Sequence, residues 1–150
     1  MELGFSSISS RSGSSGMRKK TILIADDDKA WCDSLSRYLG LNPAFEILKV
    51  VHNGEEAVDL IQDERPDVIL IDLIMPVFDG LYVIDLIRNH MYEYKPFIYV
   101  ISALDIERTH KLLASLSVGY YSVKPIHPKV VSHNLYRLLD LDSRPEVAKV

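Results

Sequence analysis

The feature that most constrains this chain is a repeated alternation between short β-branched runs and longer segments with apolar residues at helical spacing. The short runs predict strands at 21–25, 46–51, 68–71, 97–101 and 119–123. The longer segments predict helices at about 29–40, 54–63, 80–90, 105–116 and 128–140. Several of the strands are almost wholly apolar, as in parallel sheets that helices cover on both faces. The sequence therefore predicts an α/β fold, a doubly wound five-stranded parallel sheet with five helices.

Length and composition fit one domain. The 150 residues are 47% hydrophobic and carry a formal net charge of -4, and no stripe of Lys and Arg suggests direct nucleic-acid binding. Residues 1–16 include ten Ser or Gly and are interpreted as a flexible linker or expression tag. The domain is expected at 17–141, and 142–150 begins a C-terminal linker or tail. No apolar run approaches the roughly 20 residues of a membrane helix. The single Cys32 cannot form an internal disulfide, so a reducing, cytoplasmic location is expected.

Carboxylates follow two of the predicted strands. Asp26, Asp27 and Asp28 come directly after the first strand, and Asp72 follows the third. In doubly wound folds ligands bind outside the carboxyl ends of the strands, so Asp26, Asp27 and Asp72 converge if these strands are neighbours. Asp28 is expected to serve as a helix N-cap. Close carboxylates are unfavourable unless one of them is protonated or a cation neutralises them, and a site of hard oxygen ligands favours Mg²⁺. A carboxylate beside Mg²⁺ can attack phosphorus and form an acyl phosphate.

Two further polar residues end later strands. Ser102 follows the fourth strand and Lys124 the fifth. Either one alone would more often be a helix cap or a solvated charge. Their joint placement at successive strand ends favours a site in which a hydroxyl and an ammonium contact phosphoryl oxygens.

These residues carry a resemblance to a known family. The matching pieces are Asp26-Asp27, Asp72-x-x-Met75-Pro76-x-x-Asp79-Gly80, Ser102-Ala103 and Tyr121-x-x-Lys124-Pro125, in the family's order and spacing. Over about residues 18–140 the chain resembles the receiver domain of two-component response regulators. Within that family it most resembles the receiver of the master sporulation (stage-zero) regulator. The resemblance implies a flavodoxin-like fold with strand order 2-1-3-4-5.

The resemblance also implies a role for each site residue. Asp72 would be the phospho-acceptor, Lys124 the conserved-type lysine, and Ser102 and Tyr121 the switch residues. Asp26, Asp27 and Asp72, together with the backbone carbonyl of Ile74, would ligate Mg²⁺.

The resemblance implies partners as well. A sensor histidine kinase or a phosphotransfer protein would supply the phosphoryl group. The fourth helix, fifth strand and fifth helix, about residues 105–140, would then change and serve for homodimerisation or output contacts. DNA would be reached only through an output domain, where transcription is regulated.

The expected activity is that of a signalling domain that promotes its own phosphorylation, not an enzyme with a separate substrate. Ile74 and Leu104 stand two positions after the acceptor and the switch hydroxyl, and neither can orient a hydrolytic water. Autodephosphorylation is therefore expected to be slow.

Three other readings share parts of this pattern. A phosphatase of the haloacid-dehalogenase class needs a second Asp two positions after its nucleophile, where Ile74 stands. A flavodoxin needs a Ser/Thr/Gly phosphate loop after the first strand, where three Asp stand. The remaining alternative is a pseudo-receiver, which binds proteins without taking phosphate. The complete set of site residues disfavours it without excluding it.

Overall fold

The computed structural model describes residues 18–141, in which five strands alternate with five helices. The elements in chain order are β2 (Lys20–Ala25), α1 (Lys29–Gly40), β3 (Phe45–Val51), α2 (Gly54–Glu64), β4 (Val68–Ile71), α3 (Gly80–His90), β5 (Phe97–Ser102), α4 (Ile106–Ser115), β6 (Tyr120–Val123) and α5 (Pro128–Leu138). Every predicted strand and helix is present, with ends within two residues of the prediction. The predicted linker at 1–16 and the predicted tail at 142–150 lie outside the described residues.

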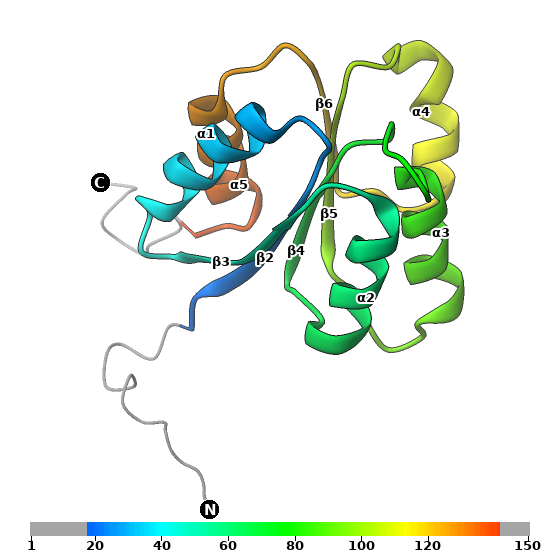
Figure 1. The fold of residues 1–150 in the computed structure, drawn as a ribbon, viewed down its shortest axis with the longest axis horizontal. Coiled ribbons are helices and arrows are strands. Elements are labelled where there is room, and N and C mark those ends of the chain that lie inside the picture. Colours follow the sequence, from blue (N-terminus) through cyan, green and yellow to red (C-terminus); the bar gives the residue numbers. More distant parts are fainter. Residues whose placement is uncertain (1–17, 142–150) are drawn as a thin grey trace, which may run out of the picture.

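The five strands form one parallel sheet in the order β3-β2-β4-β5-β6. This is the predicted order 2-1-3-4-5, so the flavodoxin-like fold is confirmed. Helices α1 and α5 cover one face of the sheet, and α2, α3 and α4 cover the other (Figure 1). The strand order reverses between β2 and β4, which is where such folds bind their ligands.

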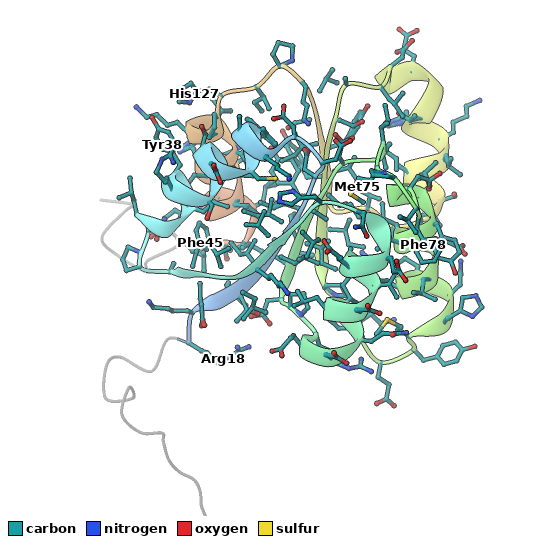
Figure 2. All side chains as sticks on the ribbon, viewed as in Figure 1. Arg18, Tyr38, Phe45, Met75, Phe78 and His127 are labelled. Atoms are coloured by element: carbon teal, nitrogen blue, oxygen red, sulfur yellow. The ribbon has the colours of Figure 1, made fainter. Side chains whose placement is uncertain are left out.

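Alternate strand residues supply two separate cores. In β2, Leu23 and Ala25 face α2 and α3, whereas Ile22 and Ile24 face α1 and α5. The side chains of strand residues point alternately to the two faces, so one apolar strand fills both cores. On the α1/α5 side the ring of Tyr38 lies edge-on against His127, with centroids 5.3 Å apart (Figure 2). Both layers therefore hold the central strands fixed.

Short polar side chains start the helices. Asp28, Asn53, Asp79 and Asp105 each accept a hydrogen bond from a backbone N–H in the first turn of the helix that follows, and His127 does the same for α5. Asp28 is thus the N-cap of α1, as predicted. Among residues 18–141 no helix is both long enough and apolar enough to cross a membrane.

Two glycines allow close backbone contacts beside the strand ends. A Cβ at Gly80 would overlap the carbonyl oxygen of Asp72, and a Cβ at Gly54 would overlap that of Phe78. The start of α2 also donates from Gly54 N to the carbonyl of Pro76, at 3.2 Å. Because no side chain intervenes, α2 and α3 pack directly against the loop that follows β4.

Candidate functional site

Three carboxylates meet where β2 and β4 end. Asp26 follows β2, Asp72 follows β4, and the two strands are directly paired, with Asp72 N donating to Ala25 O. One carboxylate oxygen from each of Asp26, Asp27 and Asp72 lies within 4.8 Å of the others. Asp26 is 3% exposed and Asp72 7%, whereas Asp27 is exposed. The predicted convergence of these three residues is confirmed.

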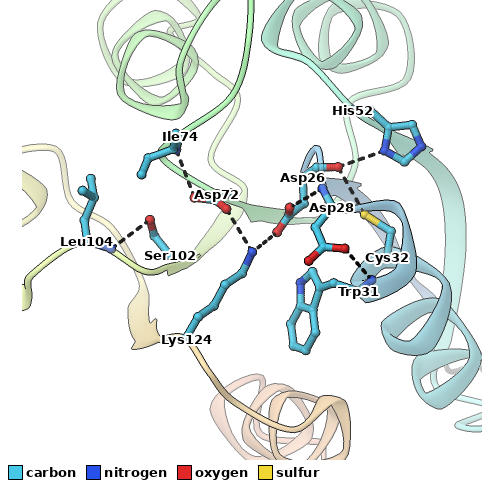
Figure 3. A network of polar contacts seen from close by, with 10 residues as sticks. All are labelled: Asp26, Asp28, Trp31, Cys32, His52, Asp72, Ile74, Ser102, Leu104 and Lys124. Carbon is cyan, nitrogen blue, oxygen red and sulfur yellow. Dashed lines mark hydrogen bonds and ion pairs between the residues drawn. The ribbon is translucent and has the colours of Figure 1, made fainter.

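Lys124 joins the two buried carboxylates. Its Nζ donates to Asp26 Oδ2 at 2.7 Å and to Asp72 Oδ2 at 3.0 Å (Figure 3). The lysine follows β6, and its backbone N–H donates to Ser102 O, so the end of β5 fixes its position. Burial by itself lowers the pKa of Lys124, but the hydrogen bonds to Asp26 and Asp72 outweigh it and raise the pKa. The ammonium therefore stays charged.

The cluster keeps an excess of negative charge. Three carboxylates face one ammonium, and burial raises the pKa of Asp26 although Lys124 and the N–H of Asp28 oppose the shift. The ligand atoms are carboxylate oxygens, and no His or Cys belongs to the group. Hard oxygen donors with uncompensated charge suit a divalent cation such as Mg²⁺. The chemistry of the donor set therefore fits the predicted metal.

Hydrogen bonds aim the two buried carboxylates. Asp72 Oδ1 accepts from Ile74 N at 3.0 Å, and Asp26 Oδ1 accepts from Asp28 N at 2.9 Å. Ile74 is 53% exposed beside Asp72. Each carboxylate thus has one oxygen bound to its own loop and one bound to Lys124.

Two contacts to Asp26 were not predicted from the sequence. His52 Nδ1 lies 2.9 Å from Asp26 O, and the thiol of Cys32 donates to the same oxygen at 3.3 Å. Burial raises the pKa of the Cys32 thiol to about 12, so it stays protonated and can donate. Both residues hold the backbone at the end of β2. Only the tertiary fold brings His52, after β3, to this carbonyl, so no local sequence signal reveals it.

Ser102 is the last residue of β5 and is fully buried. Its Oγ accepts from Leu104 N at 3.4 Å. The strands β4 and β5 are paired, so Ser102 lies at the strand end beside Asp72 (Figure 3). A buried hydroxyl at this place can donate to a group attached to Asp72.

Tyr121 lies apart from the acidic cluster. Its hydroxyl donates to Leu104 O at 2.7 Å, and Thr109 Oγ1 of α4 lies 3.4 Å from the tyrosine oxygen. The ring is half-buried and packs against the core on the α2/α3 side. Tyr121 therefore connects β6 with the loop that follows Ser102 and with α4.

A family model matches most of the described chain. The model, described as the response regulator receiver domain, covers residues 22–136. This span includes all five strands except the first two residues of β2, and every site residue named above.

Solved structures with this fold are similar over nearly their whole length. The signal receiver domain of the response regulator NarL from Mycobacterium tuberculosis is 24% identical, with a TM-score of 0.72 over 84% of this chain and 98% of that one. A CheY-like receiver domain protein from Methanospirillum hungatei is 21% identical, with a TM-score of 0.73 over 84% and 98%. The receiver domain of a Francisella response regulator is 25% identical, with a TM-score of 0.72 over 83% and 99%.

Proposed function

The chain belongs to the response regulator receiver domain family, and from this premise we propose that Asp72 accepts a phosphoryl group from a phosphohistidine of a partner protein. The observation that carries the proposal is the position of Asp72 between two acidic neighbours and one ammonium. Such a site suits a step in which a carboxylate must meet a negatively charged phosphoryl group.

The transfer balances without a further reactant. The Asp72 carboxylate oxygen forms a bond to phosphorus, the P–N bond of the phosphohistidine breaks, and its electron pair returns to the imidazole ring. The product is an acyl phosphate on Asp72. Lys124, already 3.0 Å from Asp72 Oδ2, then contacts a phosphoryl oxygen.

Metal binding belongs to the same proposal. Asp26, Asp27 and Asp72, with the backbone carbonyl of Ile74, would hold Mg²⁺. When bound, the ion neutralises charge on the phosphoryl group and orients it. Asp27 is the exposed member and is thus the one that meets an ion arriving from solvent.

Phosphorylation of Asp72 would change the surface formed by α4, β6 and α5, which lies beyond Ser102. We propose that the Ser102 hydroxyl turns toward the new phosphoryl group. Tyr121, which donates a hydrogen bond to Leu104 O, would transmit this movement to α4. The proposal that the surface formed by α4, β6 and α5 serves for homodimerisation or output contacts is supported by four exposed apolar residues: Leu112, Tyr120, Val123 and Val130.

The test is the intact mass after incubation with acetyl phosphate and Mg²⁺. The parent is expected to gain one phosphoryl group that hydroxylamine removes, and Asp72→Asn none. Asp79→Asn is the matched control, because Asp79 caps α3 in the same loop and Asn caps equally well. Modification of Asp72→Asn, or none of the folded parent, would reject Asp72 as acceptor. The second result would favour the alternative, a pseudo-receiver that binds proteins without phosphorylation.

We further propose a long-lived acyl phosphate, so that the chain acts as a signalling domain and not as a phosphatase. Ile74 and Leu104 flank the acceptor with side chains that cannot orient water. Leu104 packs against the core, so Ile74→Asn alone is the first variant. Its acyl phosphate is expected to decay several-fold faster than that of the parent. An equal half-life would remove this explanation.

The donor is proposed to be a sensor histidine kinase or a phosphotransfer protein, acting in the cytoplasm. The motifs around Asp72 and Lys124 support a place in the sporulation branch of the family. Phosphotransfer from a purified sporulation phosphotransfer protein, faster than from an unrelated one, tests this assignment. Equal rates would remove it.

A further inference from the structure

The Lys124 ammonium has a third neighbour besides its two carboxylates. The indole ring of Trp31, in the first turn of α1, lies beside it with the ring centroid 5.6 Å from Nζ (Figure 3). This distance falls within the range of a cation–π contact, in which the negative face of the ring attracts the charge. The backbone of Trp31 is fixed, because its N–H donates to the N-cap Asp28 at 3.1 Å.

These contacts hold Lys124 toward one side of the site. Asp26 and Trp31 belong to one segment, which runs from the end of β2 into the start of α1, whereas Asp72 follows β4, the neighbouring strand in the sheet. The bond to Asp26 Oδ2 is also shorter, 2.7 Å against 3.0 Å. Two of the three contacts therefore hold the ammonium on Asp26.

Both oxygens of Asp26 accept a hydrogen bond. Oδ1 accepts from the N–H of Asp28, and Oδ2 accepts from Lys124. A divalent cation that binds at Asp26 must meet or displace the ammonium there, and two like charges at one carboxylate repel each other. Whatever stabilises Lys124 on Asp26 therefore opposes the cation.

We propose that Trp31 is a positioning residue that holds the Lys124 ammonium on Asp26 and thereby lowers the affinity of the acidic cluster for Mg²⁺. The inference rests on the metal assignment of the proposed function and on no step of phosphoryl transfer. A leucine at this position keeps an apolar side chain against the α1/α5 core but has no π face, whereas a phenylalanine, although also smaller than the indole, keeps a weaker one.

The test compares Trp31→Leu and Trp31→Phe with the parent. Tyr38→Leu is the matched control, since Tyr38 is an aromatic residue of the same helix whose ring contacts His127. The first measurement is the NMR shift of the Lys124 ε-methylene protons without metal. The ring current of Trp31 is expected to move them upfield in the parent and in Tyr38→Leu, less in Trp31→Phe, and not in Trp31→Leu.

The second measurement is the Mg²⁺ dissociation constant from amide NMR titration. Trp31→Leu is expected to bind Mg²⁺ about two- to five-fold more tightly than the parent, the factor that a partly exposed cation–π contact implies. Trp31→Phe should lie between them, and it serves as the test if Trp31→Leu does not fold. Tyr38→Leu should match the parent.

Unchanged or weaker Mg²⁺ binding in the Trp31 variants would overturn the inference and leave the proposed function standing. A folded parent that binds no Mg²⁺ would overturn both. An unshifted Lys124 ε-methylene in the parent would overturn the contact on which the inference is built.

Discussion

The charge of Lys124 matters to folding as well as to chemistry. Its ammonium lies between Asp26 and Asp72, which are 3% and 7% exposed, and its own side chain is only 20% exposed. Without it, the two carboxylates would face each other with no counter-charge in a region that water reaches poorly. A buried charge that loses its partner is far more costly than a surface charge.

Lys124→Met is therefore expected to lower the free energy of unfolding by about 3 kcal/mol at neutral pH without metal. Mg²⁺, if it binds as proposed, should restore part of the loss, because it would neutralise the same carboxylates. Urea unfolding with and without Mg²⁺ measures both effects. Lys129→Met is the control, since Lys129 is exposed on α5. Equal unfolding midpoints for Lys124→Met and the parent without Mg²⁺ would contradict the account.

Val77 has an unfavourable backbone conformation in the loop that follows Asp72. Its φ is 71°, in the left-handed region that β-branched residues avoid, and its side chain is 65% exposed. Little packing therefore offsets the cost. The strain lies five residues after Asp72, in the loop that α2 and α3 pack against.

Val77→Gly is expected to raise the free energy of unfolding by roughly 1 kcal/mol, since glycine adopts this φ without strain. Thermal unfolding measures the change. Ile74→Gly serves as the control, because Ile74 is exposed in the same loop and does not have a positive φ. It should lose stability. A Val77→Gly chain less stable than the parent would show that the left-handed backbone carries no strain.

At the scale of elements, a polar network ties β5, β6 and α5 together. The Tyr99 hydroxyl lies 2.8 Å from Ser122 Oγ and accepts from Asn134 Nδ2 at 3.1 Å. Tyr99 is fully buried, so water has little access to replace its hydroxyl as the partner of Ser122 and Asn134. The edge strand β6 carries Tyr121 and precedes Lys124, and thus the network fixes the strand that brings both residues to the site.

Tyr99→Phe is expected to lower the free energy of unfolding by about 1–2 kcal/mol, because Ser122 and Asn134 lose a shared partner. Relative to the parent, the variant should also show faster hydrogen exchange at the backbone amides of β6, with a smaller increase at those of β4. Tyr120→Phe is the matched control: its ring packs edge-on against Tyr99 at 5.2 Å, and its hydroxyl has no hydrogen bond within residues 18–141. If both variants lost the same stability, the network would not be the cause.

At the scale of the whole molecule, the fold and the acidic cluster could be predicted because both depend on short-range patterns. Apolar periodicity located each element, and Asp26 and Asp72 directly follow strands that pair. The contacts that the sequence did not reveal join distant segments: Trp31 with Lys124, His52 with the Asp26 carbonyl, and Thr109 with Tyr121. Such pairs depend on side-chain directions that only the packed structure determines.

Carboxylates at the two ends of the sheet have pKa values shifted in opposite directions. Asp67 precedes β4 at the end of the sheet opposite the site, where it accepts from Thr21 N at 2.9 Å and from Thr21 Oγ1 at 3.0 Å. It also pairs with Arg18, which is labelled in Figure 2. Burial alone would raise the pKa of Asp67, but these donors outweigh it and lower the pKa. At the site, burial instead raises the pKa of Asp26. Folding thus favours the anion of Asp67, whereas burial of Asp26 outweighs the donors that stabilise its anion.

Lowering the pH should therefore reduce the stabilisation that the Asp67 carboxylate contributes. The pKa of Asp67 is lower in the folded than in the unfolded chain, so its contribution is present above the ordinary Asp pKa of about 4 and is lost as the pH falls through the folded value. Asp67→Asn is expected to cost about 1 kcal/mol at pH 7, with the difference from the parent shrinking toward pH 3. Urea unfolding across this range measures it, and Asp63→Asn, at an exposed position of α2, should show no such trend. Asp26 is present in the parent and in both variants, so the difference in the free energy of unfolding between Asp67→Asn and the parent reports on Asp67 alone. If this difference stayed constant with pH, it would contradict the anionic role of Asp67.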